Sequence, residues 1–267
     1  MTENIIVRET PSELRRLARA VLRGNWKKLF AGFVIYSIFA VFIPNILTEM
    51  VDSFSTSVYI EELGMYYSFP TFLHVYRLVL TGVLQFGLYA FILRFLRTRE
   101  VRYDRLFSGF EHLFPVFLLS FIVSVMVGLW SMLLIVPGLI AWLRYYTAMY
   151  ILHDDPQIGV FGAIRASKVM TYGNKSLIFV TLLSFIGWRI LAYLPAGILD
   201  GFYAAGLLSN MSTTVLVTLE YLLLLPSYFV AVYAETTMAL LYEIMSGRLR
   251  KTAPAMSAPM PGNNMGF

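Results

Sequence analysis

The sequence predicts an all-α protein: a polytopic transmembrane bundle of about six spans, arranged as three helical hairpins with cytoplasmic amphipathic helices at the membrane interface. The first observation is composition, since 58% of the 267 residues are hydrophobic and only 14% are charged, against roughly 45–50% and about 25% in soluble domains. The second is patterning, because the charged residues cluster between long uncharged runs, as they do when bilayer-embedded and solvated segments alternate. Both observations argue against a water-soluble enzyme.

The N-terminal segment, residues 1–28, predicts an amphipathic helix that lies in the interface. Thr10 can cap this helix, Pro11 takes the favoured first position, and Glu13 completes a capping box. Its apolar stripe has the spacing of a helical face and consists of Leu14, Leu17, Ala18, Val21 and Leu22. The cations expected at lipid headgroups are Arg15, Arg16, Arg19 and Arg23. Gly24 is expected to end the helix.

The first two spans are uncharged runs. Leu29–Thr48 holds twenty residues without a charge, and a rise of about 1.5 Å per residue carries them across the ~30 Å hydrocarbon core. Leu78–Leu93 holds sixteen uncharged residues, and the flanking Arg77 and Arg94 can snorkel to opposite interfaces. Each run therefore predicts one crossing.

A longer run, Leu113–Leu143, has 31 residues without a charge and is too long for one crossing. Pro137-Gly138 interrupts it, so we predict span three over Leu113–Leu134 and span four over Gly138–Leu152. The Pro-Gly pair has two interpretations: the outer turn of a hairpin, or a discontinuous helix that exposes backbone groups to a ligand as in transporters. No clean counterpart occurs in the other half of the chain.

The last two spans each contain one charge. The fifth run, Ser176–Leu199, is broken by Arg189, and the sixth, about Thr213–Glu235, contains Glu220. Together the six spans define a transmembrane domain over residues 29–246. The remaining residues, 247–267, are of low complexity and rich in proline and glycine, which predicts a disordered cytoplasmic tail.

The positive charges orient the bundle. Lys and Arg in short loops stay on the cytoplasmic side, and 18 of the 21 basic residues lie before residue 29, at 94–105, at 165–175 or at 248–251. Both termini are therefore expected in the cytoplasm. The net charge of +5 favours membrane lipids as partners, through anionic headgroups at the cytoplasmic face. No nucleic-acid partner is expected, because no basic patch on a soluble domain or recognition module is present.

An internal repeat is predicted 149 residues apart. Arg16, Gly24, Asn25 and Phe30 align without gaps on Arg165, Gly173, Asn174 and Phe179, and Arg19 aligns on Lys168. The Gly-Asn pair falls at the same joint in both copies, between a basic helix and a span, where a left-handed residue can end a helix. A weaker third unit is Tyr103–Phe110. Arg165 and Lys168 therefore join the four N-terminal arginines as predicted membrane-interface residues.

These residues and several others resemble a family of bacterial integral membrane proteins, the domain of unknown function nine-seven-five. The matching pieces are Ala18-Arg19-Ala20 with Leu22 and Gly24-Asn25-Trp26; Gly109-Phe110; Pro137-Gly138-Leu139-Ile140-Ala141 with Arg144-Tyr145; Tyr150-Ile151-Leu152 with Asp155-Pro156; Ala163, Ser167, Met170 and Gly173-Asn174-Lys175; and Ser184-Phe185-Ile186-Gly187-Trp188. The resemblance covers most of residues 14–243. It implies a six-helix protein of the bacterial cell membrane and brings no established activity.

Ionisable groups inside a bilayer are costly and are therefore candidates for function. Arg144, Arg189 and Glu220 qualify, and Gln85 adds a polar group. The functional interpretation pairs Glu220 with Arg189 across neighbouring spans, as the lining of a polar path or binding cleft. The alternative is that both arginines snorkel to the interface and Glu220 makes a structural pair with a partner helix.

The sequence contains no recognisable catalytic or cofactor set. There is no cysteine, the three histidines are far apart, and no metal-binding spacing, phosphate loop or nucleophile elbow occurs. We therefore expect no enzyme, no cofactor and no metal. The favoured function is a non-enzymatic membrane module that organises protein partners or lipids. The alternatives are a small transporter or permease component and, with the least support, an intramembrane enzyme.

Overall fold

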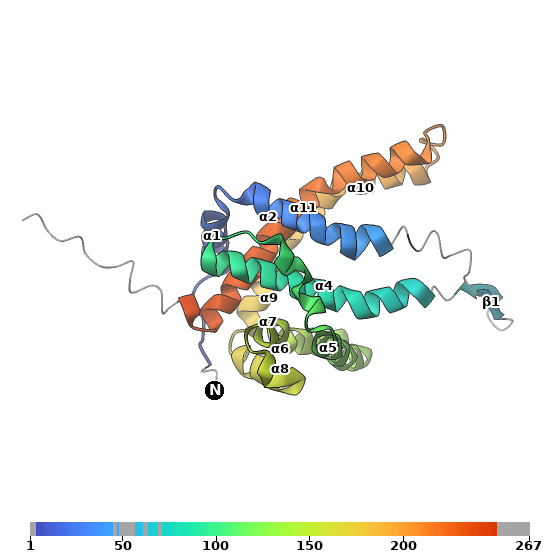
Figure 1. The fold of residues 1–267 in the computed structure, drawn as a ribbon. Coiled ribbons are helices and arrows are strands. Elements are labelled where there is room, and N and C mark those ends of the chain that lie inside the picture. Colours follow the sequence, from blue (N-terminus) through green and yellow to red (C-terminus); the bar gives the residue numbers. More distant parts are fainter. Residues whose placement is uncertain (1–3, 45–46, 48–56, 61–63, 69–70, 250–267) are drawn as a thin grey trace, which may run out of the picture.

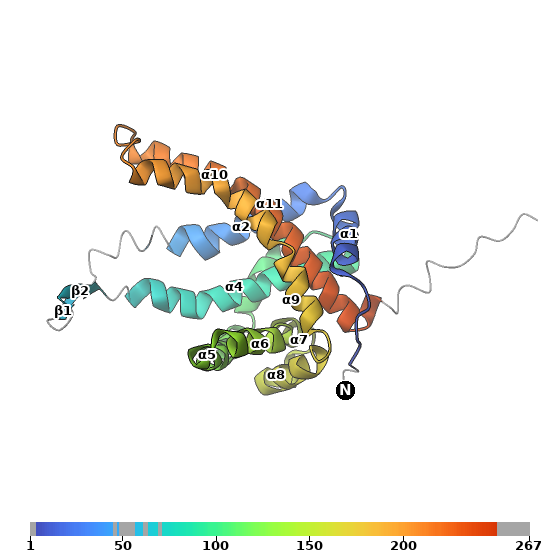
Figure 2. The same ribbon diagram turned by 180° about the vertical axis from the view of Figure 1, so that it is seen from behind.

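The computed structural model describes residues 4–44, 47, 57–60, 64–68 and 71–249. Helices dominate this part of the chain, and Figures 1 and 2 show them as an elongated bundle. The N-terminal half contains α1 (Pro11–Leu22), α2 (Trp26–Ser37), the π-helical turn η1 (Ile38–Phe42), strands β1 (Ser57–Ile60) and β2 (Met65–Ser68), α4 (Thr71–Thr98), the 3-10 helix η3 (Tyr103–Phe110) and α5 (Leu113–Leu133). The C-terminal half contains α6 (Ile135–Tyr145), α7 (Ala148–Asp154), η4 (Pro156–Ile158), α8 (Gly159–Met170), α9 (Lys175–Leu183), α10 (Ile186–Ala204) and α11 (Thr213–Met245).

Five helical segments of the described chain are long and apolar enough to cross a bilayer. They are Val79–Thr98, Leu113–Leu133, Ile135–Asp154, Lys175–Ala204 and Thr214–Met245. The first predicted span, Leu29–Thr48, is not among them, and residues 45, 46 and 48 of this segment lie outside the described residues. The all-α bundle with several apolar helices is confirmed.

The surface of these helices is apolar to an extent that a water-soluble monomer does not tolerate. Large hydrophobic side chains are exposed along α5, α6, α10 and the first half of α11, with Met132, Ile135 and Ile190 at 87%, 85% and 63% exposure. This exposed surface is compatible with a bilayer, where lipid chains would remove it from water.

The buried core lies around α4 and the second half of α11. Phe86, Phe91 and Ile92 of α4 are almost fully buried, as are Met238 and Leu241 of α11. Figures 1 and 2 show α1 beside the C-terminal ends of α4 and α11, opposite the β1–β2 hairpin and the α10–α11 connection. We call this end, formed by α1 and residues 94–105 and 243–249, the basic end.

The N-terminal helix α1 has the predicted capping box. The Thr10 hydroxyl accepts a hydrogen bond from the Glu13 amide at 3.3 Å, and the Glu13 carboxylate accepts one from the Thr10 amide at 2.7 Å. This second bond holds the pKa of Glu13 below its ordinary value. The apolar stripe packs on α11, with Leu14, Ala18 and Leu22 fully buried, so the helix is part of the protein core as well as an interface element.

The hairpin of spans three and four turns earlier than predicted. The helix ends at Leu134, which is extended at φ −162° and ψ 150°, and Pro137 lies in the first turn of α6. A proline clashes with the carbonyl four residues before it, here that of Leu133, so a continuous helix breaks one turn ahead of the ring. Gly138 then lets α6 approach α5, because a Cβ at this position would overlap the Ser131 side chain.

The last two spans are longer than predicted. The fifth run folds as α9 and α10, which together reach Ala204 instead of Leu199. The sixth continues as one helix to Met245, ten residues past Glu235. These extra residues include Thr236 and Glu243, whose polarity masks the helix in the sequence, but the structure buries them in the core.

The connection between the first two predicted spans contains a short hairpin. β1 pairs with β2 in antiparallel register, with Ser57 opposite Ser68 and Ile60 opposite Met65. Residues 51–56, 61–63, 69 and 70 of this connection lie outside the described residues.

Candidate functional site

The four predicted intramembrane site residues do not form one cluster. Arg144 lies exposed at the end of α6, near Lys168 and Lys175, with which it lines a cavity of about 370 Å³. Arg189 is exposed on α10, and within the described chain it forms no ion pair with Glu220. The charge of Arg189 acts on Glu235 of α11. The proposed role of Arg189 and Glu220 in a polar path stays a prediction.

Gln85 belongs to a polar cluster inside the bundle. It accepts a hydrogen bond of 2.9 Å from the Tyr36 hydroxyl, which joins α4 to α2. Tyr89 stacks on Tyr150 with ring centroids 4.2 Å apart, and Tyr150 stacks in turn on Tyr242 at 4.8 Å. The bundle interior therefore contains an aromatic column with hydroxyl groups that runs from α4 through α7 to α11.

Glu235 of α11 is close enough to this aromatic column for its charge to act on the tyrosines. Electrostatic interactions connect its carboxylate with the hydroxyls of Tyr36, Tyr89, Tyr146 and Tyr150. One carboxylate oxygen, Oε2, is buried without a hydrogen-bond partner among the described residues. A carboxylate in this setting can take up a proton or a cation, because an unpartnered buried charge is expensive.

A second cluster, at the basic end, consists of ion pairs between helices that are far apart in sequence. Arg97 of α4 donates to Glu243 of α11 at 2.5 and 3.0 Å and contacts Asp154 of α7 at 2.8 Å. Asp154 also accepts hydrogen bonds from Tyr242 and Arg248. The two carboxylates are only 5–6% exposed, so each buried negative charge is compensated by an arginine.

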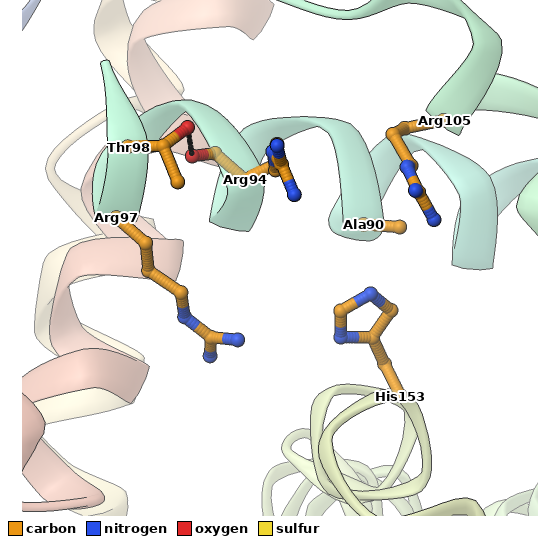
Figure 3. A pocket seen from close by; sticks show the side chains of 6 residues that line it. All are labelled: Ala90, Arg94, Arg97, Thr98, Arg105 and His153. Atoms are coloured by element: carbon orange, nitrogen blue, oxygen red, sulfur yellow. Dashed lines mark hydrogen bonds between the residues drawn. The ribbon is translucent and has the colours of Figure 1, made fainter. Parts of the chain in front are cut away.

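A cavity of about 220 Å³ lies beside this network, between the end of α4, η3 and the end of α7. It is lined by Ala90, Arg94, Arg97, Thr98, Arg105 and His153. Figure 3 shows the side chains of Arg97, Arg105 and His153 extending into the space between these elements. The lining side chains that carry charge are all basic.

The position of η3 against α4 depends on two glycines. A Cβ at Gly87 of α4 would overlap the Leu106 carbonyl oxygen, and one at Gly109 of η3 would overlap the carbonyl oxygen of Val83. The two backbones are therefore in direct contact, which places Arg105 over the last turns of α4.

The predicted interface arginines lie mostly on the surface. Arg16, Arg19, Arg23 and Arg165 are exposed, and Arg15 is half-buried and reaches the Ser184 carbonyl at 3.5 Å. Lys168 lies over the Tyr145 ring at 5.6 Å. None of the six forms an ion pair with a described carboxylate.

The two Gly-Asn joints share a backbone conformation but differ in their contacts. Gly24 and Gly173 have φ of +81° and +80°, and each ends a helix as expected. Asn174 donates to the carbonyls of Ile5 and Met170 and accepts from the Val7 amide at 3.0 Å, whereas Asn25 makes no side-chain cap. The joint after α8 therefore holds the N-terminal segment in place. The repeat itself stays a prediction.

Sequence reasoning missed Glu235, Asp154 and Glu243. Glu235 is the predicted end of span six, and Asp154 lies two residues past the predicted end of span four at Leu152. The sequence signal available for Glu243 was an acidic residue in an otherwise apolar segment, Ala239–Ile244, which points to burial with a basic partner.

The fold and these clusters define a class of protein: a helical bundle whose described part contains five helices long and apolar enough to cross a membrane, with polar groups inside its hydrophobic core and one basic end. The family model described as "Protein of unknown function (DUF975)" matches residues 8–142 and 132–249, and the chain belongs to this family. This confirms the resemblance found in the sequence motifs. No curated protein and no solved structure matches the chain.

Proposed function

We propose that this protein is a non-enzymatic membrane module. It gathers anionic lipid headgroups at the cytoplasmic face of a bacterial cell membrane and presents its basic end to a protein partner. The single observation that carries the proposal is the surplus of positive charge at that end.

The surplus follows from how the charges pair. The buried acids, Asp154 and Glu243, form ion pairs with Arg97 and Arg248. Arg16, Arg19 and Arg23 of α1 face outward and have no ion-pair partner among the described acids. Near an anionic membrane surface each such cation contributes about 1 kcal/mol of attraction.

The geometry of α1 suits this role. Leu14, Ala18 and Leu22 anchor one face of the helix on α11, and the Tyr233 hydroxyl donates to the Arg15 carbonyl at 3.0 Å. The arginines on the other face are therefore presented by a rigid support, which reduces the entropy lost when a headgroup or partner binds.

Native mass spectrometry of the protein, purified in mild detergent from its membrane, tests the proposal. Arg16→Gln with Arg19→Gln should lose most of the co-purifying anionic lipid and weaken any stoichiometric protein partner. The control is Ser209→Glu with Asn210→Glu, which lowers the net charge by the same amount at the opposite end. Equal lipid retention in both double variants would contradict the proposed role of the basic end.

A small transporter or permease component is the second candidate, and Glu235 is the observation that favours it. The unpartnered carboxylate oxygen among tyrosine hydroxyls is the arrangement expected of an intramembrane ion or proton site. In reconstituted vesicles, Glu235→Gln should abolish transport, whereas Glu220→Gln should leave it intact. Equal sensitivity of the two variants, or none, would count against this candidate.

A further inference from the structure

The cavity beside Arg97 has the location and size of a binding site. Its α4 residues, Ala90–Thr98, form the last turns of the candidate span Val79–Thr98, so it lies where that span reaches the level of headgroups and water. Its volume of about 220 Å³ equals several water molecules at about 30 Å³ each. The volume accommodates a tetrahedral oxyanion together with bound water.

Two arginines at the cavity have unused hydrogen-bond donors. The Nε atoms of Arg94 and Arg105 are buried and have no hydrogen-bond partner among the described residues. Arginine presents its donors as a planar fork that matches two oxygens of a carboxylate or phosphate. An unsatisfied buried donor is costly, and an anion in the cavity would remove that cost.

The acidic groups near the cavity contact its arginines, but among the described residues none accepts a hydrogen bond from the Nε of Arg94 or Arg105. Asp104 accepts two hydrogen bonds of 3.1 Å from Arg102, which hold the pKa of Asp104 below its ordinary value, and Arg105 lies 3.8 Å from it. Glu100 contacts Arg94 at 3.2 Å from an exposed position. Asp154 and Glu243 are shared between Arg97 and Arg248.

His153 completes the lining on the α7 side. Its Nδ1 lies 3.3 Å from Asp154, and its ring packs against Phe86 at 5.6 Å between centroids. These two contacts fix the ring, so His153 adds an oriented polar group opposite Arg94 and Arg105. The cavity thus combines a fixed wall with two arginines that have donors to offer.

We propose that this cavity binds one phosphate group, which Arg94 and Arg105 hold by charge-assisted hydrogen bonds. The phosphate is the terminal group of an anionic lipid or of a soluble phosphate monoester, since both offer the same chemistry. The inference rests on the proposed function, because both assume that the basic end binds an anionic ligand. It differs in assigning that ligand to one specific cavity and not to the whole charged surface.

The test uses the full-length protein in nanodiscs. One arm measures binding of inorganic phosphate by calorimetry in discs of phosphatidylcholine alone. The other counts phosphatidic acid molecules retained by native mass spectrometry from mixed discs. Arg105→Gln should weaken binding by about tenfold or more, because a hydrogen bond to a charged group is lost. Arg8→Gln, an exposed arginine outside the cavity, should change it less than about twofold.

The outcomes separate the sources and the two proposals. Saturable binding of phosphatidic acid alone identifies a lipid headgroup, and saturable binding of inorganic phosphate identifies a site open to soluble phosphate. Absence of one-site binding in both arms, or unchanged binding by an Arg105→Gln protein with a wild-type melting temperature, overturns the site. If the variant with Arg16→Gln and Arg19→Gln keeps its bulk anionic lipid while one-site binding is observed, the proposed function fails and the cavity site stands. If that variant loses its bulk lipid but no one-site binding is found in the wild-type protein, the cavity site fails and the proposed function stands.

Discussion

Arg97 joins three helices at the basic end through a single guanidinium group. Its donors reach Glu243 on α11 and Asp154 on α7, two acids that are almost completely buried. Charges in such positions need both an opposite charge and hydrogen bonds to offset their desolvation. The network therefore fixes the relative positions of α4, α7 and α11, and it supports the wall of the adjoining cavity.

Replacing Arg97 should destabilise the protein more than replacing a surface arginine. Arg97→Met leaves Glu243 with Arg248 at 3.8 Å as its nearest cation. We expect a loss of at most about 3 kcal/mol, the low end for a broken buried pair, because the Arg97 side chain is about one-third exposed.

The measurement is the unfolding midpoint in detergent, with Arg102→Met as the control. Arg102 forms a comparable pair with Asp104, but both side chains are more than half exposed, so its removal should leave the midpoint almost unchanged. Equal shifts of the midpoint for Arg97→Met and Arg102→Met would show that the buried network stabilises the protein no more than an exposed ion pair does.

At the scale of elements, packing determines positions that local sequence cannot. The backbones of α4 and η3 touch at Gly87 and Gly109, which brings Arg105 to the cavity. Nothing in either segment alone indicates this contact, since the glycines could equally mark flexible turns. The same applies to Asn174, whose partners Ile5 and Val7 are more than 160 residues away.

Gly87→Ala tests the contact between α4 and η3. Its Cβ would overlap the Leu106 carbonyl, so the backbone must shift, and we expect a cost of about 1–3 kcal/mol as for overpacking elsewhere. Gly128→Ala is the matched control in α5, where a Cβ meets nothing within 4 Å and alanine favours the helix. In thermal unfolding in detergent, Gly87→Ala should lower the unfolding midpoint and Gly128→Ala should not. An equal decrease in both variants would refute the close-contact explanation.

On the scale of the whole molecule, the sequence predicted what composition and hydropathy determine. The all-helical bundle, the capping box of α1 and the helix end at Gly24 followed from local patterns. The polar sites did not, because their members come from different helices: the charge of Arg189 on α10 acts on Glu235 of α11, and Arg97 lies 57 residues from Asp154 and 146 from Glu243. Long-range pairing is information that a single sequence does not display.

The structure also makes the predicted orientation testable in a direct way. The chain contains no cysteine, so a single introduced thiol is the only one that a maleimide can label. Gln157 lies exposed beside the basic end, just after Asp154, and Ser209 lies exposed in the α10–α11 connection at the other end of the bundle. If the positive charges keep the basic end in the cytoplasm, the two positions lie on opposite sides of the membrane.

Membrane-impermeant maleimide applied to intact cells should therefore label Ser209→Cys and spare Gln157→Cys. After permeabilisation both variants should react, which confirms that each thiol is accessible and each protein is present. Labelling of Gln157→Cys alone in intact cells would invert the topology and place the basic end outside, where the proposed recruitment of cytoplasmic partners is impossible. Labelling of both would mean that the bundle between these two positions does not span the bilayer.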